Sequence, residues 1–562
     1  MEKRLFLAVL ISVAFLWAWA ALAPKFFPDA VKKKAVPATA SASAPSGTAL
    51  TNSTGTANAP TASAVTPAPV LPVPAPVPVA AAQITNPVAA SELQFKTVET
   101  SEYVARFSNK GAELVSFQLR NFKIGDGSLV ELVKARDAAR NDFPFAIEAA
   151  DANLAQRLNS ALYQVSDRTE NDARILEFRF AAADGVSATK TFRFTGEFLF
   201  AFSVSVTPAT APYRVAIGPG IRTLGPDEKD SQFIVTGNGV MQREDSLKVV
   251  NREKADRVQS WDAPFQFVGI EDNYFLTAIK PDRSGSAVLR RIEVPAGKDE
   301  KRMELYAAVN AAPGGVVSGS AFFGPKKTDI LDRYGLEKTL QFGVFGVIGR
   351  FLLIALIWIN KATKNYGYAI ILLTVIIKIV LYPLQHKQIV SMKKMQKVQP
   401  KINSIRDRYK KAKSDAEQRQ KMNTEMMKLY QQEGINPMSG CLPLILQLPI
   451  LWGFYGLLSR AIELRGAPFL LWIHDLSAKD PYYITPILMT ITMFAQQWIT
   501  PTTADPAQRR MFMVMPIVFG WIFKEFPSGL VLYWLVQNVL SIVQQLIMNK
   551  YWKDHPPSLT TT

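Results

Sequence analysis

Long uncharged, apolar stretches mark this sequence at its start and throughout its C-terminal part. Residues 5–23 carry no charge, and about 20 helical residues suffice to cross the hydrocarbon core of a bilayer. Five further stretches are candidate spans: 366–385, 441–458, 482–498, 511–523 and 530–548. The sequence therefore predicts a polytopic α-helical membrane protein with a large insert between its first apolar stretch and the others.

The first apolar stretch and the residues after it form two distinct segments. Ala21-Leu22-Ala23 resembles a signal-peptide cleavage site, but the length of the stretch and the proline that follows favour an uncleaved anchor at residues 1–23. Residues 24–92 are rich in Pro, Ala, Ser and Thr, and no charge occurs between residues 35 and 91. Such a composition buries too little apolar surface to offset the entropy of ordering, so we predict a disordered linker.

The hydrophobic pattern changes to a period of two within residues 93–328. Phe198, Phe200, Phe202 and Val204 alternate with smaller or polar residues, and turn signals that contain glycine separate several such runs. This alternation predicts antiparallel strands with one buried face, and the number of strands indicates a β-sandwich. The sequence of this domain shows no nucleophile elbow, phosphate-binding loop or metal-ligand spacing.

Charge adds a marker of topology to this pattern. The chain has a formal net charge of +17, and residues 384–436 hold 13 Lys or Arg against 5 Asp or Glu. Basic residues next to spans resist translocation, which places this segment in the cytoplasm. A nucleic-acid partner also suits basic residues, but the position beside a span favours the topological explanation. One cysteine and three scattered histidines exclude a disulfide framework and a zinc site.

Residues 329–365 decide on which side of the membrane the β-domain lies. If the apolar part of this segment, 342–360, lies flat at the interface, the β-domain is outside and the N-terminus is cytoplasmic. If it crosses the bilayer, the β-domain is cytoplasmic. Lys25 and Lys32–Lys34 favour the crossing, because basic residues stay inside. Arg350 within the segment and the short gap that follows it favour an interfacial helix.

Several strings in the C-terminal part carry a specific resemblance. They are Gly440-Cys441-Leu442-Pro443, Gln447-Leu448-Pro449-Ile450, Trp472-Ile473-His474-Asp475-Leu476-Ser477, Thr500-Pro501-Thr502-Thr503 and Phe526-Pro527-Ser528-Gly529-Leu530. Together with the architecture, these strings resemble the YidC/Oxa/Albino family of membrane-protein insertases, in its Gram-negative form with a large periplasmic domain. The resemblance is strongest over residues 366–548 and looser through the β-domain.

The resemblance implies six transmembrane helices and a periplasmic β-super-sandwich in the bacterial inner membrane, with both termini in the cytoplasm. Residues 329–365 would then connect the domains and form the interfacial helix. Residues 366–549 would form a five-helix insertase core with a cytoplasmic hairpin at 386–435, and residues 550–562 a cytoplasmic tail.

The resemblance also implies a membrane protein insertase and chaperone that is not an enzyme and needs no cofactor or metal. Its implied partners are nascent membrane proteins, the Sec translocon (SecYEG and SecDF), ribosomes with the signal recognition particle pathway, and membrane lipids. A sequence-specific nucleic-acid partner is not implied.

Lys378 lies inside the 366–385 stretch, where a charge costs roughly 2.5–3.5 kcal/mol on insertion scales. The resemblance places it at a position in a hydrophilic groove that usually holds arginine, with Thr374 and Trp534 along the path of the client. A fixed cation attracts the acidic residues of a client tail, and Thr374 shares its helical face at i−4. The alternative is a snorkelling lysine whose ammonium reaches the headgroups.

Five methionines accompany the basic residues of the predicted hairpin: Met392, Met395, Met422, Met426 and Met427. Flexible thioethers suit promiscuous apolar contact with clients, while the charges suit ribosomal RNA or lipid headgroups. The alternative is a two-helix hairpin that packs its methionines internally.

Two other functions compete with insertion. An intramembrane cation also suits the path of a solute or ion transporter, although the sequence shows no internal repeat of the transporter kind. The β-domain of the family resembles galactose mutarotase, which suits an enzyme or a sugar receptor, although the sequence shows no recognisable catalytic set.

Overall fold

The structure is a computed structural model, and it describes most of the chain after residue 86. The described residues are 87–133, 143–208, 212–222, 224, 228, 234–244, 246–252, 259–261, 265–282, 286–295, 301–311, 315–343, 345–409, 415–434, 442–499 and 506–554. The predicted anchor at 1–23, most of the predicted linker and the end of the predicted tail lie outside them.

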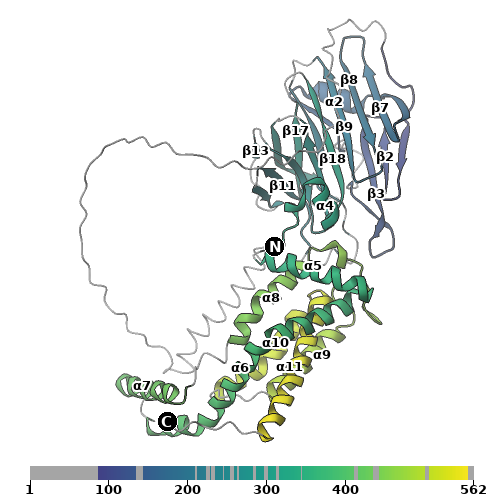
Figure 1. The fold of residues 1–562 in the computed structure, drawn as a ribbon. Helices are drawn as coiled ribbons and strands as arrows, with labels where there is room; N and C mark the ends of the chain where they lie inside the picture. The colour runs from purple at the N-terminus through teal and green to yellow at the C-terminus, as the bar shows by residue number, and fades with distance from the viewer. Residues whose placement is uncertain are drawn as a thin grey trace, which may run out of the picture. The chain divides into compact units, whose positions relative to one another are not determined.

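Within the described residues, the strands form three antiparallel sheets (Figure 1). The first has the order β1 (Phe95–Glu99), β2 (Tyr103–Ser108), β3 (Glu113–Lys123), β4 (Leu129–Glu131). The second has the order β13 (Gln259–Trp261), β16 (Ala287–Pro295), β17 (Lys301–Asn310), β10 (Tyr213–Pro219), β5 (Ile147–Ala149). The largest has the order β12 (Ser246–Val250), β11 (Asn238–Arg243), β14 (Phe267–Glu271), β15 (Phe275–Pro281), β18 (Val316–Pro325), β9 (Leu199–Thr207), β8 (Ser187–Phe194), β7 (Ala173–Ala181), β6 (Gln164–Glu170). One helix, α2 (Ala152–Ser160), lies among these strands.

The predicted alternation along the strands is confirmed, and it builds a large hydrophobic core. In β9, Phe200, Phe202 and Val204 are buried while the residues between them are not. The rings of Phe145 and Phe200 lie 6.0 Å apart, and those of Phe200 and Phe323 lie 5.8 Å apart. Aromatic rings at such separations stabilise a core beyond the area they bury.

The described end of the predicted linker already contacts this domain. Val88 forms an isolated antiparallel bridge with Ala181, and the Ala90 amide donates to the Leu162 carbonyl at 2.9 Å. These hydrogen bonds replace water on the backbone of the linker and tie it to the edge of the sheet.

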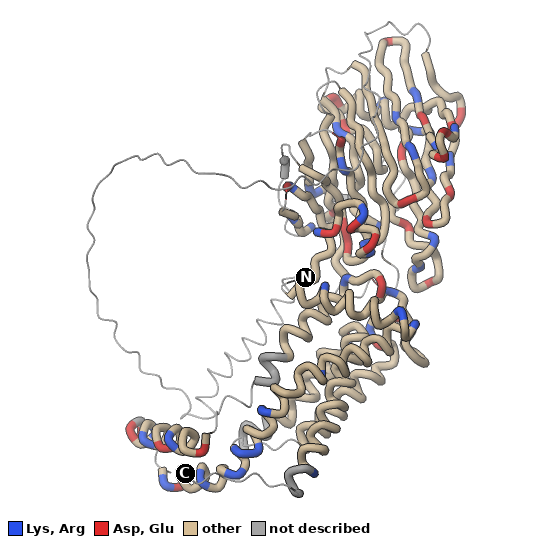
Figure 2. Tube along the Cα trace, viewed as in Figure 1, with Lys and Arg blue, Asp and Glu red and all other residues tan. Residues whose placement is uncertain are grey.

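The helices follow the strands along the chain. They are α4 (Thr328–Tyr334), η2 (Glu337–Thr339), α5 (Gly346–Thr363), α6 (Tyr366–Arg408), α7 (Ala416–Gln432), α8 (Leu442–Leu458), η5 (Ile462–Leu464), α9 (Ile484–Ile499), α10 (Pro506–Phe523) and α11 (Ser528–Asp554). Helix α11 packs against α6, α8 and α9, while α5 packs against α6 and α8, and α10 packs against α9. Figure 2 shows few charges on the helices of this bundle and many on α7 and the end of α6.

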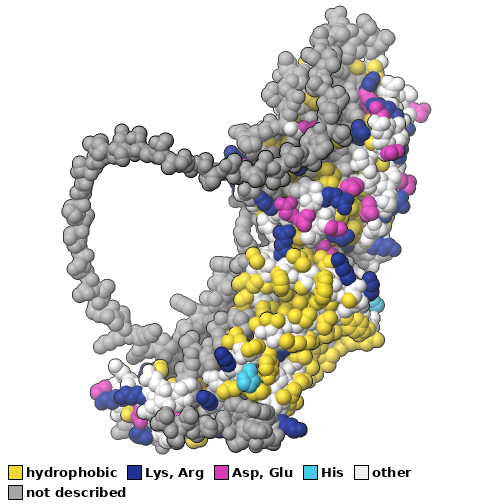
Figure 3. All heavy atoms as spheres, viewed as in Figure 1, with side chains coloured by type: hydrophobic (Ala, Val, Ile, Leu, Met, Phe, Trp, Pro, Cys, Tyr) yellow, Lys and Arg dark blue, Asp and Glu magenta, His cyan; other side chains and the backbone are white. Residues whose placement is uncertain are grey.

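Three described helices are long and apolar enough to cross a membrane: Gly346–Thr363, Tyr366–Arg408 and Ser528–Lys550. The segments Gln447–Leu458 and Phe512–Phe523 are apolar but shorter. Hydrophobic side chains cover most of the visible face of this helical part, as a lipid-facing surface requires (Figure 3). The fold is therefore a β-rich domain joined to a set of apolar helices, while the number of six spans stays a prediction.

Helix α5 has one buried face and one exposed apolar face. Leu352, Leu356 and Ile359 are buried, whereas Phe351 and Trp358 are exposed. A helix that exposes large apolar side chains on one side is suited to lipid, either within the bilayer or along its interface. The prediction of an interfacial helix therefore stays open.

Helix α6 continues far beyond the predicted span at 366–385. It runs without a break for 43 residues through Pro383 and Pro400, which gives it a length of about 65 Å at helical rise. That length is about twice the hydrocarbon core, so the basic half of α6 must leave the bilayer. The first arm of the predicted hairpin is therefore a direct extension of the helix that carries Lys378. At its other end, the Asn365 side chain caps α6 by accepting from the Gly367 and Tyr368 amides.

Candidate groove between α6, α8, α9 and α11

Helix α11 carries a polar face inside an otherwise apolar span. The uncharged polar residues in the middle of this helix are Gln537, Asn538, Ser541, Gln544 and Gln545. Their spacing of three and four residues brings these side chains to neighbouring turns of one side of the helix. All five are buried or half-buried, whereas Val539, Val543 and Ile547 on the other side are exposed. The helix therefore turns its polar side towards the bundle.

Lys378 of α6 reaches this polar face. Its ammonium donates a 2.8 Å hydrogen bond to the Ser541 hydroxyl, which itself donates to the Gln537 carbonyl at 2.8 Å. Lys378 is half-buried, and none of the ion pairs among the described residues includes it. Among the residues that the structure describes, the only hydrogen-bond partner of this cation is therefore a neutral hydroxyl, which leaves its charge available to an incoming anion.

Helices α8 and α9 complete the polar network. Gln447 of α8 donates to the hydroxyl of Tyr533, and Gln537 donates to the Gln447 amide oxygen at 3.5 Å. Asn538 donates to the Thr492 hydroxyl of α9 at 3.2 Å. Four helices thus contribute polar groups at one level of the bundle.

Two polar atoms of this network have no hydrogen-bond partner among the described residues. They are Oε1 of Gln537 and Nε2 of Gln544, and both are buried. Buried polar atoms that lack a protein partner are normally satisfied by water, because leaving them unpaired costs about 1–3 kcal/mol each. The network is therefore suited to a hydrated groove rather than to a dry core.

The three groove residues predicted from the sequence, Lys378, Thr374 and Trp534, lie in different environments. Lys378 is joined to α11 as described, but Thr374 is fully buried and its hydroxyl donates to the Ile370 carbonyl at 2.6 Å. A threonine bonded to its own helix in this way offers no free donor to a client. Trp534 lies two turns before Ser541 and packs against Phe523 of α10, with ring centroids 5.2 Å apart.

The most extensive polar face was not among the residues predicted from the sequence. Ser541 contacts the Lys378 ammonium, and the polar network continues through Gln537, Asn538 and Gln447. None of these four residues was predicted as a site residue. The sequence does contain a signal for this face, namely five polar side chains at helical spacing within an apolar stretch. Exposure of these side chains to lipid would cost free energy. Such a face has to be turned inwards.

The five methionines predicted at the hairpin fall into different environments. Met395 and Met426 pack against a small core formed by Val398 and Ile402. Met392 and Met422 are half-buried, whereas the side chain of Met427 is 51% exposed. Ion pairs from Lys401 to Glu433 (2.7 Å) and from Arg408 to Glu425 (2.6 Å) also join the two arms. Internal packing therefore accounts for two of the five, and Met427 has the most exposed side chain of the five.

Comparison with known proteins identifies relatives of both parts of the chain. The description "60Kd inner membrane protein" matches residues 358–555, and "YidC periplasmic domain" matches residues 96–355. A "Membrane protein insertase YidC" of Citrifermentans bemidjiense is 38% identical over 99% of this chain and 100% of its own length. One of Geobacter metallireducens is 35% identical over 98% of each chain. A solved structure of an active YidC insertase is 18% identical, with a TM-score of 0.36, and covers 82% of this chain and 93% of its own.

Proposed function

The chain belongs to the YidC family of membrane-protein insertases, and from this premise we propose that it inserts client helices by way of the polar face of α11 and the cation of Lys378. The family is one of inner-membrane insertases rather than enzymes, and its large domain is periplasmic. The observation that carries the proposal is the hydrogen bond between Lys378 and Ser541, which places a charge beside the polar face of α11.

The physical task of an insertase is to lower the cost of moving a polar tail across an apolar layer. Each polar group that leaves water without a partner costs several kcal/mol in hydrocarbon. A hydrated face lined by Gln537, Asn538 and Ser541 supplies replacement partners, and Lys378 attracts the carboxylates of the tail. The apolar part of the client then gains about 0.8 kcal/mol per buried CH₂ group as it moves into lipid. No nucleotide is required for this step.

The test is insertion by the purified, full-length protein in liposomes. Protease is added outside the liposomes. The client segment that has crossed the membrane should resist digestion when the liposomes contain the protein, and the client should be digested when the liposomes are empty. The family resemblance further supports action as a chaperone and cooperation with the Sec translocon, ribosomes and the signal recognition particle pathway. The same assay with and without the translocon separates independent from cooperative insertion.

A reporter fusion tests the proposed orientation, with cytoplasmic termini and a periplasmic β-domain. Ser128 lies in the turn between β3 and β4, where its amide and hydroxyl bond the Asp126 carboxylate at the surface. Alkaline phosphatase folds only outside the cytoplasm, so a fusion after Ser128 should be active. A fusion after Met427 in the basic hairpin should be about tenfold less active or inactive, because that segment stays inside. Activities in the reverse order, with both fusions expressed at full length, would contradict this topology.

We also propose that the hairpin meets clients before the groove does, through its outward side. A photo-crosslinker at Met427 should capture a ribosome-bound client, because this side chain is exposed. The same crosslinker at Met426, the adjacent position, should capture much less, because that side chain packs against Val398 and Ile402. Equal capture at both positions would contradict the assignment of faces, and capture at neither would leave the hairpin a purely structural element.

A further inference from the structure

The loop between α8 and α9, residues 459–483, lies at one end of the helix bundle (Figure 1); we call it the outer loop. It contacts the first residues of two spans at once. The Phe469 ring lies on Gly367 at the start of α6, and the Asn365 side chain donates to the Phe469 carbonyl at 3.1 Å. At the start of α11, the Ser528 and Gly529 amides donate to the Ala478 and Leu476 carbonyls at 2.7 and 2.9 Å.

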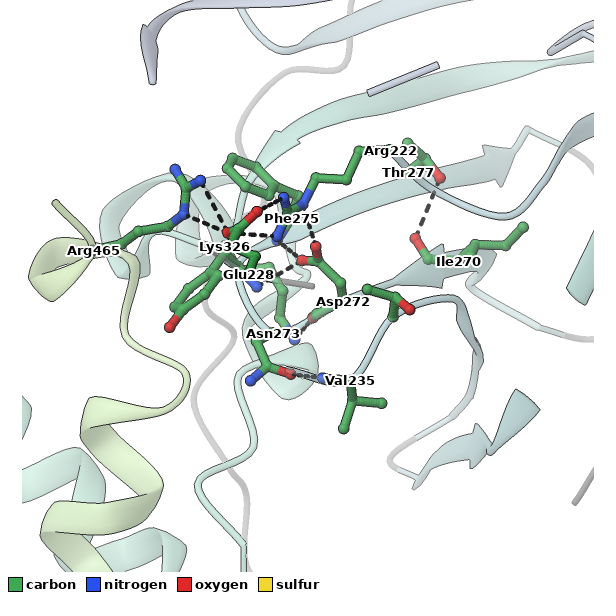
Figure 4. Close-up of polar contacts among 12 residues, drawn as sticks. Arg222, Glu228, Val235, Ile270, Asp272, Asn273, Phe275, Thr277, Lys326 and Arg465 are labelled. Atoms are coloured by element: carbon green, nitrogen blue, oxygen red, sulfur yellow. Dashed lines mark hydrogen bonds and ion pairs between the residues drawn. The ribbon is translucent and has the colours of Figure 1, made fainter. Parts of the chain in front are cut away.

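A chain of four alternating charges joins this loop to the β-domain (Figure 4). Asp272 pairs with Arg222 at 2.5 Å, and Arg222 pairs with Glu228 at 2.5 Å. Glu228 then pairs with Arg465 of the outer loop at 3.0 Å. Arg222 and Asp272 have no exposed side-chain surface, and Arg465 retains only 8%. Glu228 thus pairs with two buried guanidiniums at once.

The surroundings fix both arginines in place. The Phe275 ring lies 5.0 Å from the Arg222 guanidinium and 5.4 Å from that of Arg465. Arg465 also donates to the Lys123 carbonyl at 3.1 Å, and Asn273 donates to the Ser459 carbonyl at 2.7 Å. A guanidinium is planar and presents its donors in a fixed fork, so such contacts define the position of the loop backbone.

We propose that Glu228 is a positioning residue: it holds the outer loop against the β-domain and thereby keeps the outer end of the bundle closed. Removal of its charge leaves Arg222 and Arg465 facing each other without the carboxylate that both of them contact. Like charges at short distance in a buried site repel strongly, so the loop should move away from the domain. This inference rests on the proposed function for its meaning, because the closed end is that of the client path.

The test measures exposure of the loop with a cysteine reporter in the full-length protein in lipid nanodiscs. Cys441 is replaced by serine, and Ala461→Cys supplies a reporter at a buried loop position that accepts a small side chain. Ala188→Cys, buried in β8, supplies a second reporter for unfolding of the β-domain. The rate of modification by a maleimide is then compared among variants.

Glu228→Gln and Arg465→Met should each increase the rate of maleimide modification at the Ala461→Cys reporter about tenfold. The modification rate at the Ala188→Cys reporter should not change. Arg465→Lys keeps the positive charge but loses the planar array of guanidinium donors, so its modification rate at the Ala461→Cys reporter should be intermediate. The double variant should react no faster than the faster single variant, because both changes break the same contact. Glu197→Gln, which breaks the exposed pair with Arg333, is the matched control and should leave both rates unchanged.

Three results would overturn the inference. They are an unchanged rate at Ala461→Cys in Glu228→Gln, equal increases at both reporters, and effects of the two single changes that multiply in the double variant. Client insertion by the unmodified protein is measured in parallel in liposomes. Failure of that insertion would refute the proposed function and leave the labelling result valid, so the two failures are distinguishable.

Discussion

Replacement of Lys378 by glutamate should reduce the insertion of clients with acidic tails at least about tenfold, which corresponds to about 1.4 kcal/mol in the barrier. Two unit charges about 8 Å apart contribute roughly 2 kcal/mol at an effective dielectric constant near 20, and the substitution reverses the sign of that term. The half-buried position of Lys378 beside Ser541 means that this field acts inside the groove. Initial rates of protease protection in liposomes, for one client with an acidic tail and one with a neutral tail, measure the effect.

Three comparisons separate charge from shape at this position. Lys378→Arg should insert both clients at nearly normal rates, because the charge is kept and only the geometry of its donors changes. Lys378→Ala should slow the acidic tail less than Lys378→Glu does, because the polar face of α11 remains. Equal insertion of both clients by all these variants would contradict an electrostatic role and favour a snorkelling lysine.

Replacement of Gly456 by alanine should disrupt the packing of α8 against the segment that enters α5. A methyl group on Gly456 would lie 2.2 Å from the carbonyl oxygen of Phe342, and one on Gly453 would lie 2.8 Å from Ile348. Small residues allow such close approach between membrane helices, and overpacking typically costs about 1–3 kcal/mol. The melting temperature of the solubilised protein should therefore fall by about 2–12 °C, at roughly 2–4 °C per kcal/mol.

Gly346→Ala is the matched control for this prediction. Gly346 is the first residue of α5. Apart from its chain neighbours and the backbone of its own helix, no atom of the described residues lies within 4 Å of the position that its methyl group would occupy. The melting temperature of this variant should not fall. If Gly456→Ala were as stable as Gly346→Ala, the close contact between α8 and Phe342 would not exist in solution.

The sequence predicted the elements whose pattern has a single physical cause. Alternation along β9 follows from one buried face, so Phe200, Phe202 and Val204 could be assigned to a sheet core directly. The outcome was different for α6, where the span was predicted at 366–385 but the helix continues without a break through Pro383 and Pro400 to Arg408. A proline in a long helix removes one hydrogen bond, and the remaining helix can tolerate that loss.

Side-chain contacts across helices could not be read from spacing. Thr374 shares a helical face with Lys378, yet its hydroxyl is occupied by the Ile370 carbonyl. Ser541 is 163 positions away in the chain and is the residue that Lys378 contacts. Likewise, nothing in the spacing of Glu228 and Arg465, which are 237 positions apart, indicates that they pair. Such pairs depend on tertiary packing, which periodicity does not encode.

The most direct test of the central claim is a reciprocal exchange of charge between groove and client. The protein with Lys378→Glu is reconstituted in liposomes without a membrane potential, and a client is prepared whose acidic tail residues are replaced by lysine. If the charge at position 378 draws the tail into the groove, the variant should insert the basic-tailed client faster than the acidic-tailed one, and the unmodified protein should show the opposite order. If the variant slows both clients equally, or changes neither, then the charge of Lys378 does not guide the tail.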